Sequence, residues 1–104
     1  MKKILLCCSA GMSTSLMVNK MRKVAEEHNI PVEINATGID RFETEIKNYD
    51  VVLLGPQVRF KLNEFQLIAE KNGKKVAVID TKDYGIMDGK KVLSQAIKLI
   101  KENA

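Results

Sequence analysis

The hydrophobic positions of the chain follow two alternating kinds of pattern. Four short apolar runs have the length of buried strands, and they span residues 4–7, 32–36, 51–54 and 76–79. The segments between and after these runs carry apolar residues three or four positions apart, the spacing that gives a helix one apolar face. The pattern therefore predicts strands and helices in alternation.

Each predicted helix has its own apolar stripe. The period of 3.6 residues is strong in the first and last helices and weaker in the second. In the second helix, Asp40 and Glu43 have the spacing of a capping box, and Asn72-Gly73 is expected to end the third. The stripes are Met17, Met21, Val24 and His28; Ile39, Phe42 and Ile46; Val58, Leu62, Phe65 and Ala69; and Leu93, Ala96, Ile97 and Ile100.

Alternating strands and helices with short connections predict an α/β fold with a parallel sheet between two helical layers. Right-handed crossovers leave few topologies, and we expect four strands in the order 2-1-3-4 within a single domain, residues 1–104. Ligands of such sheets bind beyond the carboxyl ends of the strands, where the strand order reverses. Three segments should meet there, namely residues 8–15, 55–57 and 80–85.

Composition and charge disfavour three classes of protein: nucleic-acid-binding, secreted and membrane-spanning proteins. The 104 residues carry a net charge of +4, and the lysines are neither clustered nor interleaved with aromatic residues, so nucleic-acid binding is disfavoured. We find no secretory signal and no apolar stretch of membrane-spanning length. The two adjacent cysteines are poorly placed to form a disulfide with each other. We therefore expect a cytoplasmic protein with reduced thiols and no direct membrane insertion.

The segment CSAGMSTS, residues 8–15, is the candidate site. Because it joins a strand to a helix, its backbone N–H groups should converge at the positive end of that helix and favour an anion. The same groups would stabilise a thiolate, so Cys8 is the candidate nucleophile. The alternative for Cys8 is a buried, inert cysteine at a helix start. Cys7 precedes it on the strand, and we predict that it fills the core, because alternation sends its side chain to the other face.

The side chains of this loop limit the chemistry. Ser13, Thr14 and Ser15 can cap the helix or donate hydrogen bonds to phosphate oxygens. A cysteine phosphatase needs the pattern Cys-x5-Arg, but the sixth residue after Cys8 is Thr14. The Gly-Lys-Ser/Thr ending of a nucleotide-binding loop is also missing. A thiol without that arginine favours a phosphocysteine that is passed on to another acceptor over one that is hydrolysed.

Residues of the other two segments are weaker candidates. Pro56 and Gln57 could form a wall of the site or simply a tight turn, and Phe60 lies off its helix stripe and could be exposed for docking. Asp80 and Tyr84 could line the site, with a helix cap and core packing as the alternatives. His28 is the only histidine and is expected to be structural, and we expect no metal.

At this point the chain resembles a known family. The segments CSAGMSTSLMVNKMR and DVVLLGPQV, and the pattern ID-x3-YG-x2-DG, are similar to the IIB component of the sugar phosphotransferase system, in its lactose/cellobiose/chitobiose class. The resemblance covers essentially the whole chain. It implies a four-stranded parallel sheet flanked by helices, and no cofactor.

The resemblance also implies a role for the cysteine loop. The cysteine before Ser-Ala-Gly, which is Cys8, would accept a phosphoryl group from a phosphohistidine on a IIA protein. It would then pass that group to a sugar bound by the IIC membrane permease, such as cellobiose, chitobiose or a related β-disaccharide. The phosphate-binding residues carried over are Ser9, Ala10, Gly11, Met12, Ser13, Thr14 and Ser15. We expect a monomer; a cysteine phosphatase or an anion-binding module are the competing interpretations.

Overall fold

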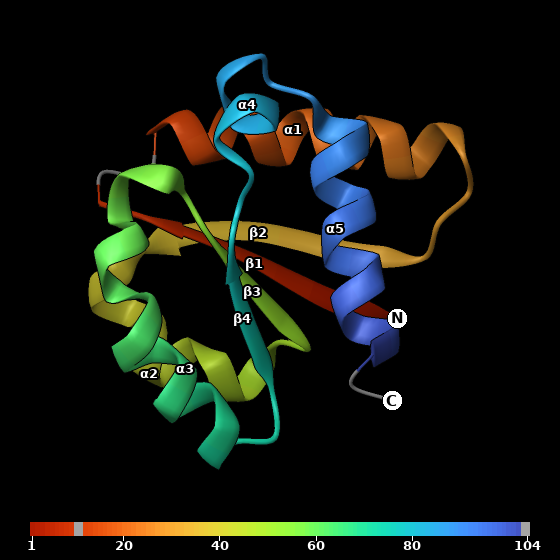
Figure 1. Cartoon of the computed structure of the whole chain (residues 1–104). Helices are drawn as coiled ribbons and strands as arrows, with labels where there is room; N and C mark the ends of the chain where they lie inside the picture. The colour runs from red at the N-terminus through yellow and green to blue at the C-terminus, as the bar shows by residue number, and fades with distance from the viewer. Residues whose placement is uncertain (10–11, 103–104) are drawn as a thin grey trace.

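The parallel sheet predicted from the sequence is present in the structure, a computed structural model that describes residues 1–9 and 12–102. Four parallel strands lie in the order β2-β1-β3-β4, as predicted (Figure 1). The strands are β1 (Lys2–Cys8), β2 (Val32–Gly38), β3 (Val51–Leu54) and β4 (Lys75–Val78). The α-helices are α1 (Met12–Glu27), α2 (Phe42–Glu45), α3 (Leu62–Lys71), α4 (Thr81–Gly85) and α5 (Gly89–Glu102), and the 3-10 turns are η1 (Ile39–Arg41), η2 (Ile46–Asn48) and η3 (Pro56–Lys61).

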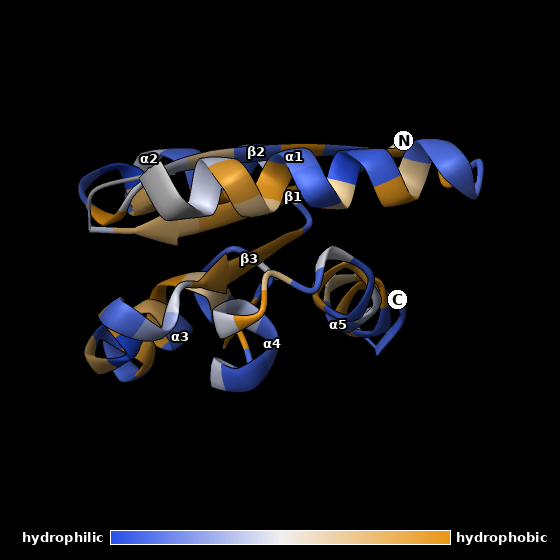
Figure 2. Ribbon diagram, turned by 90° about the horizontal axis from the view of Figure 1, so that it is seen from above, coloured by the Kyte–Doolittle hydropathy of each residue, from blue (hydrophilic) through white to orange (hydrophobic). Residues whose placement is uncertain are grey.

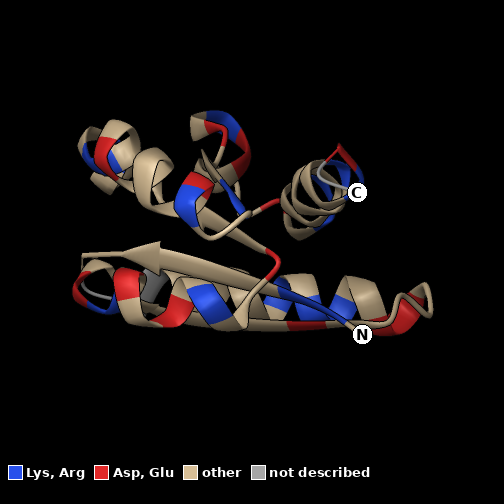
Figure 3. Cartoon of the chain, turned by 90° about the horizontal axis from the view of Figure 1, so that it is seen from below, with Lys and Arg blue, Asp and Glu red and all other residues tan. Residues whose placement is uncertain are grey.

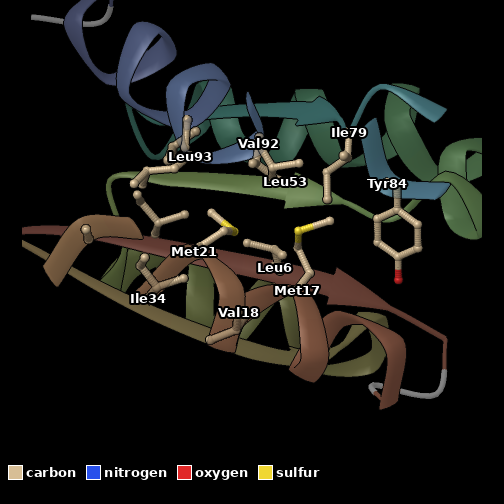
Figure 4. Packing of buried hydrophobic residues seen from close by; sticks show 14 residues of the cluster. Leu6, Met17, Val18, Met21, Ile34, Leu53, Ile79, Tyr84, Val92 and Leu93 are labelled. Atoms are coloured by element: carbon tan, nitrogen blue, oxygen red, sulfur yellow. The ribbon is translucent and has the colours of Figure 1, made fainter. Parts of the chain in front are cut away.

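The helices cover both faces of the sheet and divide the core in two. Ile4 and Leu6 of β1 pack with Met17 and Met21 of α1 and with residues of α5 (Figure 4). The alternate residues Leu5 and Cys7 enter a second cluster on the side of α2 and α3. In that cluster the rings of Phe42 and Phe65 stack with centroids 3.8 Å apart. In Figure 2 the strands β1 and β3 are mostly hydrophobic, whereas α1 alternates between hydrophobic and hydrophilic residues.

Three details of the expected elements are wrong. The second helix is a single α-turn between η1 and η2, and the residue before η1 is Gly38, which makes no side-chain cap, so the capping box of Asp40 and Glu43 does not form. The reason is that β2 continues to Gly38, which places Asp40 inside the first turn. The expected loop at residues 80–85 is the short helix α4. His28 lies beyond the end of α1 and is exposed.

Side chains from neighbouring helices cover both edges of the sheet. On β2, Arg22 of α1 donates from Nε and Nη2 to the carbonyl of Ile34, at 2.9 and 2.6 Å. On β4, Gln95 of α5 donates from Nε2 to the carbonyl of Val78, at 2.9 Å. These bonds satisfy strand carbonyls that face away from the sheet.

One glycine sets how closely α5 approaches α1. A Cβ at Gly89 would lie 2.8 Å from the backbone carbonyl carbon of Lys20, closer than such atoms approach in proteins. By contrast, a Cβ at Gly85 would meet no other atom within 4 Å. The two glycines therefore form a matched pair for testing this contact.

We expect Gly89→Ala to lower the free energy of unfolding by about 1–3 kcal/mol, because α5 must move away from the backbone of α1. Gly85→Ala should be neutral or raise it by up to about 1 kcal/mol, because alanine restricts the unfolded chain. Urea denaturation of both variants beside the wild type measures the difference. Equal stability of the two variants would contradict the close contact.

Candidate functional site

The carboxyl ends of the first and third strands bring two of the predicted segments together. Cys7 pairs with Leu54 of β3, and the backbone N–H of Gly55 donates to the carbonyl of Cys7 at 2.8 Å. On the other side of β1, Cys8 pairs with Gly38, the last residue of β2. The cysteine at the end of β1 thus lies at the point where the strand order reverses, as the sequence predicts.

Cys8 faces the layer of α1. Its side chain has the same orientation as Ile4 and Leu6, and only 3% of the residue is exposed. The Sγ atom of Cys8 lies 3.4 Å from Oγ1 of Thr14, which is fully buried in the first turn of α1. The hydroxyl donates in this bond when the sulfur is a thiolate. Thr14 therefore occupies, six residues after the cysteine, the position that holds arginine in a cysteine phosphatase.

The start of α1 adds to this polarity. The helix has 16 residues and no acidic residue in its first turn, so its positive end is not neutralised by the helix itself. Ser9 and Ser15 are exposed on either side of the helix start, and the backbone of Met12 and Ser13 forms the first turn. The predicted loop residues Ala10 and Gly11 lie outside the described residues. A helix end and a hydroxyl beside a thiol both favour its ionised form.

Gly55 lies close beside Cys8. A Cβ at Gly55 would lie 3.3 Å from Cβ of Cys8 and 2.8 Å from Oε1 of Gln57, so only glycine fits without a shift. Pro56 is buried and Gln57 is exposed. The close neighbour of Cys8 in this segment is thus Gly55, and the predicted wall residues Pro56 and Gln57 follow it directly in the chain.

In the third predicted segment, residues 80–85, the observed contacts of Asp80 and Tyr84 are structural. The carboxylate of Asp80 accepts the backbone N–H of Asp83 at 3.0 Å and caps α4, which is the alternative predicted for it. Tyr84 is 7% exposed and belongs to the core cluster with Met17 and Ile79, beside which its ring lies in Figure 4. Packing is thus the observed role of Tyr84, at the end of the core near the start of α1.

Cys7 has the opposite environment from its neighbour. It is fully buried in the second core cluster, as predicted. Burial is the largest of the effects that raise the pKa of the Cys7 thiol from 9.0 to about 12, and the negative charges of Cys8, Asp40 and Glu45 add to it. Cys7 therefore stays a neutral thiol at physiological pH.

The surface of the described residues has mixed charge (Figure 3), and one shallow hollow of about 240 Å³ includes the predicted site residue Ser15. Another hollow, of about 540 Å³, is formed by α3, β4 and α5 and contains no residue of the three predicted segments. Lys and Arg are interspersed with Asp and Glu on the outer elements (Figure 3). Within residues 1–9 and 12–102, no cluster of His, Cys, Asp and Glu could hold a metal ion, and no helix is long and apolar enough to cross a membrane.

The comparison with known families decides the class of this site. A family model described as "PTS system, Lactose/Cellobiose specific IIB subunit" matches residues 3–95. The chain belongs to this family. IIB components take part in sugar phosphotransfer as phosphotransferases, together with IIA and IIC components. The resemblance seen in the sequence is thereby confirmed, and so is the fold that it implies.

Relatives of this IIB chain carry names with different sugars. The oligo-beta-mannoside-specific EIIB component of Bacillus subtilis (strain 168) is 46% identical over 100 residues, covering 96% of this chain and 97% of the relative. The galactose-specific EIIB component of Lactococcus lactis subsp. cremoris (strain MG1363) is 43% identical over 104 residues, covering 95% and 96%. The solution structure of a cellobiose-specific phosphotransferase IIB component protein from Borrelia burgdorferi is 40% identical, with a TM-score of 0.83 over 99% of this chain and 94% of that one.

The raised pKa of Cys7 makes the stability of the protein sensitive to alkali. Above pH 9 the unfolded chain loses the Cys7 proton, whereas the folded chain keeps it up to about pH 12. Stability should therefore fall with rising pH in this window, by roughly 1 kcal/mol per pH unit from this group. We expect Cys7→Ala to have a shallower loss of stability than the wild type between pH 9 and pH 10.5 in urea titrations. Identical slopes would show that Cys7 ionises equally in both states.

Proposed function

We propose that the chain is a cytoplasmic phosphoryl carrier in which Cys8 is the phosphorylated residue. Cys8 receives the group from a phosphohistidine on a IIA protein and passes it to a sugar bound by a IIC permease. The observation that carries this proposal is the placement of Cys8 at the end of β1, with its sulfur 3.4 Å from the hydroxyl of Thr14. Membership of the IIB family supports the direction of transfer.

The reaction that fits this site is an in-line displacement. The thiolate of Cys8 attacks phosphorus, the S–P bond forms, and the P–N bond to the imidazole of the partner breaks. The electron pair of that bond returns to the imidazole nitrogen. Backbone N–H groups of the phosphate-binding loop, Ser9 to Ser15, and the start of α1 stabilise charge on the phosphoryl oxygens. In the second step the sugar hydroxyl attacks phosphorus, the P–O bond forms and the S–P bond breaks, and the hydroxyl proton passes to the released thiolate.

The missing arginine favours transfer over hydrolysis. Thr14 offers one neutral donor in the place of a bidentate cation, so the loop gives less stabilisation to attack by water. A cysteine phosphatase is the competing candidate, and hydrolysis of an aryl phosphate through Cys8 would favour it.

The domain organisation, the oligomeric state and the sugar are further parts of the proposal. We propose that residues 1–104 form one IIB domain, that it acts as a monomer, and that it binds IIA and IIC in turn on the same face. The sugar that we propose is a β-linked disaccharide such as cellobiose or chitobiose. The oligo-beta-mannoside and cellobiose names of two similar proteins support this class.

Intact mass identifies the carrier residue directly. After incubation with phosphoenolpyruvate, the general phosphotransferase proteins and a cognate IIA, we expect one phosphoryl group on the wild type and on Cys7→Ser. Cys8→Ser should gain none, because serine lacks a comparable nucleophile at neutral pH. The masses are measured without acidification.

Cys7→Ser is the matched control, because it removes the adjacent thiol and leaves the loop unchanged. An adduct on Cys8→Ser, or none on the wild type when IIA itself is phosphorylated, would overturn the proposal.

Exposed apolar side chains mark the face on which partners would bind. Phe60 of η3 is 72% exposed, and Leu16 of α1 and Ile86, just after α4, are also largely exposed. These residues follow three different strands that all end at the same edge of the sheet. Phe60 follows five residues after Gly55, which packs against Cys8. We therefore assign Phe60 to the contact with IIA, in agreement with its predicted docking role.

Phe60→Ala should raise the KM for phosphorylated IIA about tenfold and leave kcat nearly unchanged, because a central aromatic contact contributes more than about 1 kcal/mol to binding. Leu67→Ala is the control, because Leu67 is similarly exposed at 63% but lies within α3. Steady-state transfer to Cys8 at varied IIA measures both constants. Equal effects of the two variants would remove Phe60 from the interface.

A further inference from the structure

The 3-10 turn η3 carries an arginine and directly follows the glycine that lies against Cys8. It begins at Pro56, directly after Gly55, whose backbone packs on the side chain of Cys8. Arg59 lies in the next turn, and its Nη1 donates to the carbonyl of Pro56 at 3.0 Å. This bond folds the side chain back toward the wall of the site, while the other N–H groups of the guanidinium remain available.

Arg59 differs from other cations at this edge of the sheet. Arg41 of η1 forms an ion pair with Glu45 at 3.8 Å, and Lys61 of η3 forms one with Glu64 at 3.4 Å. Among the described residues, Arg59 is in no ion pair, and its one hydrogen bond goes to a neutral carbonyl oxygen. The residue is exposed, so its positive charge is accessible to a partner.

The negative charge of the transferred phosphoryl group favours a cation at this site. A phosphoryl group in transit carries negative charge on its equatorial oxygens. The chain contains no Lys or Arg between Ser9 and Asn19, so the loop itself offers backbone and hydroxyl donors alone. Two carboxylates near the cysteines add negative charge that a cation would offset. Asp40 and Glu45 lie close enough to raise the pKa of the Cys7 thiol.

We propose that Arg59 binds the phosphoryl group as it passes between the histidine of the partner and Cys8. Its planar guanidinium exchanges the carbonyl of Pro56 for phosphoryl oxygens, which it can hold with two parallel hydrogen bonds. Arg59 stays protonated throughout and takes no part in bond making. This role rests on the proposed function of Cys8, and Arg59 acts only during the transfer from the partner, so it does not replace the phosphatase arginine that would hold the phosphocysteine for attack by water.

The test compares three variants in transfer from phosphorylated IIA to Cys8. Arg59→Gln keeps much of the side-chain length and removes the charge. Arg59→Lys keeps the charge and removes the planar guanidinium that can form two parallel hydrogen bonds. Arg41→Gln is the control. Rapid-quench measurement at saturating phosphorylated IIA gives the transfer rate. Isothermal titration with unphosphorylated IIA gives the affinity that does not depend on the phosphoryl group.

We expect Arg59→Gln to slow transfer by about 10–100-fold, with Arg59→Lys between it and the wild type. The affinity of Arg59→Gln for unphosphorylated IIA should stay within twofold of the wild type. Its melting temperature should stay within 2 °C, because the side chain of Arg59 is exposed and is bound to one carbonyl. Arg41→Gln should transfer at the rate of the wild type.

Three results would overturn the role of Arg59: a rate for Arg59→Gln within twofold of the wild type, an equal loss in Arg41→Gln, or a loss explained by weaker binding of unphosphorylated IIA. Each leaves the carrier function of Cys8 intact, because wild type and Cys7→Ser would still be phosphorylated. An absence of phosphoryl transfer to the wild type would overturn both proposals together.

Discussion

The alternation of side chains along β1 is the constraint on which the site depends. Residues one position apart in a strand point to opposite faces of the sheet, so Cys7 and Cys8 cannot share an environment. Cys7 enters the core beneath α2 and α3, where burial raises the pKa of its thiol. Cys8 faces α1, with its sulfur beside the hydroxyl of Thr14. One strand thus makes two chemically identical residues into an inert one and a candidate nucleophile.

The site obtains its polarity mainly from neutral groups. A helix start, a buried hydroxyl and a close glycine backbone surround the sulfur, and each is fixed by the fold. Fixed dipoles stabilise an anion without the cost of desolvating a charged side chain. They also hold the group less firmly than a bidentate arginine does, which suits a residue that must release what it receives. An arginine on a separate turn would act only when a phosphoryl group is present.

Much of this architecture could be predicted from the sequence, because the repeating patterns are strong. The apolar runs located all four strands, and the switch point followed from their order, so Cys8 could be assigned to the site. The errors occurred where a few local residues compete. Asp40 was expected to cap a helix, but the length of β2 is set by pairing with β1, which local spacing does not reveal. The placement of Arg59 depends on a bond to a backbone carbonyl three residues away, and no sequence motif records it.

The contact between Gly89 and Lys20 joins the C-terminal helix to the middle of α1, whose first turn lies at the cysteine. A helix is a stiff rod, so the point where α5 presses on its middle also sets the direction in which its first turn points. Gly89, about eighty residues away from Cys8 in the chain, therefore helps to set the direction of the α1 dipole at the sulfur. A substitution at Gly89 would change how strongly that dipole stabilises the thiolate, although no residue around the sulfur is replaced.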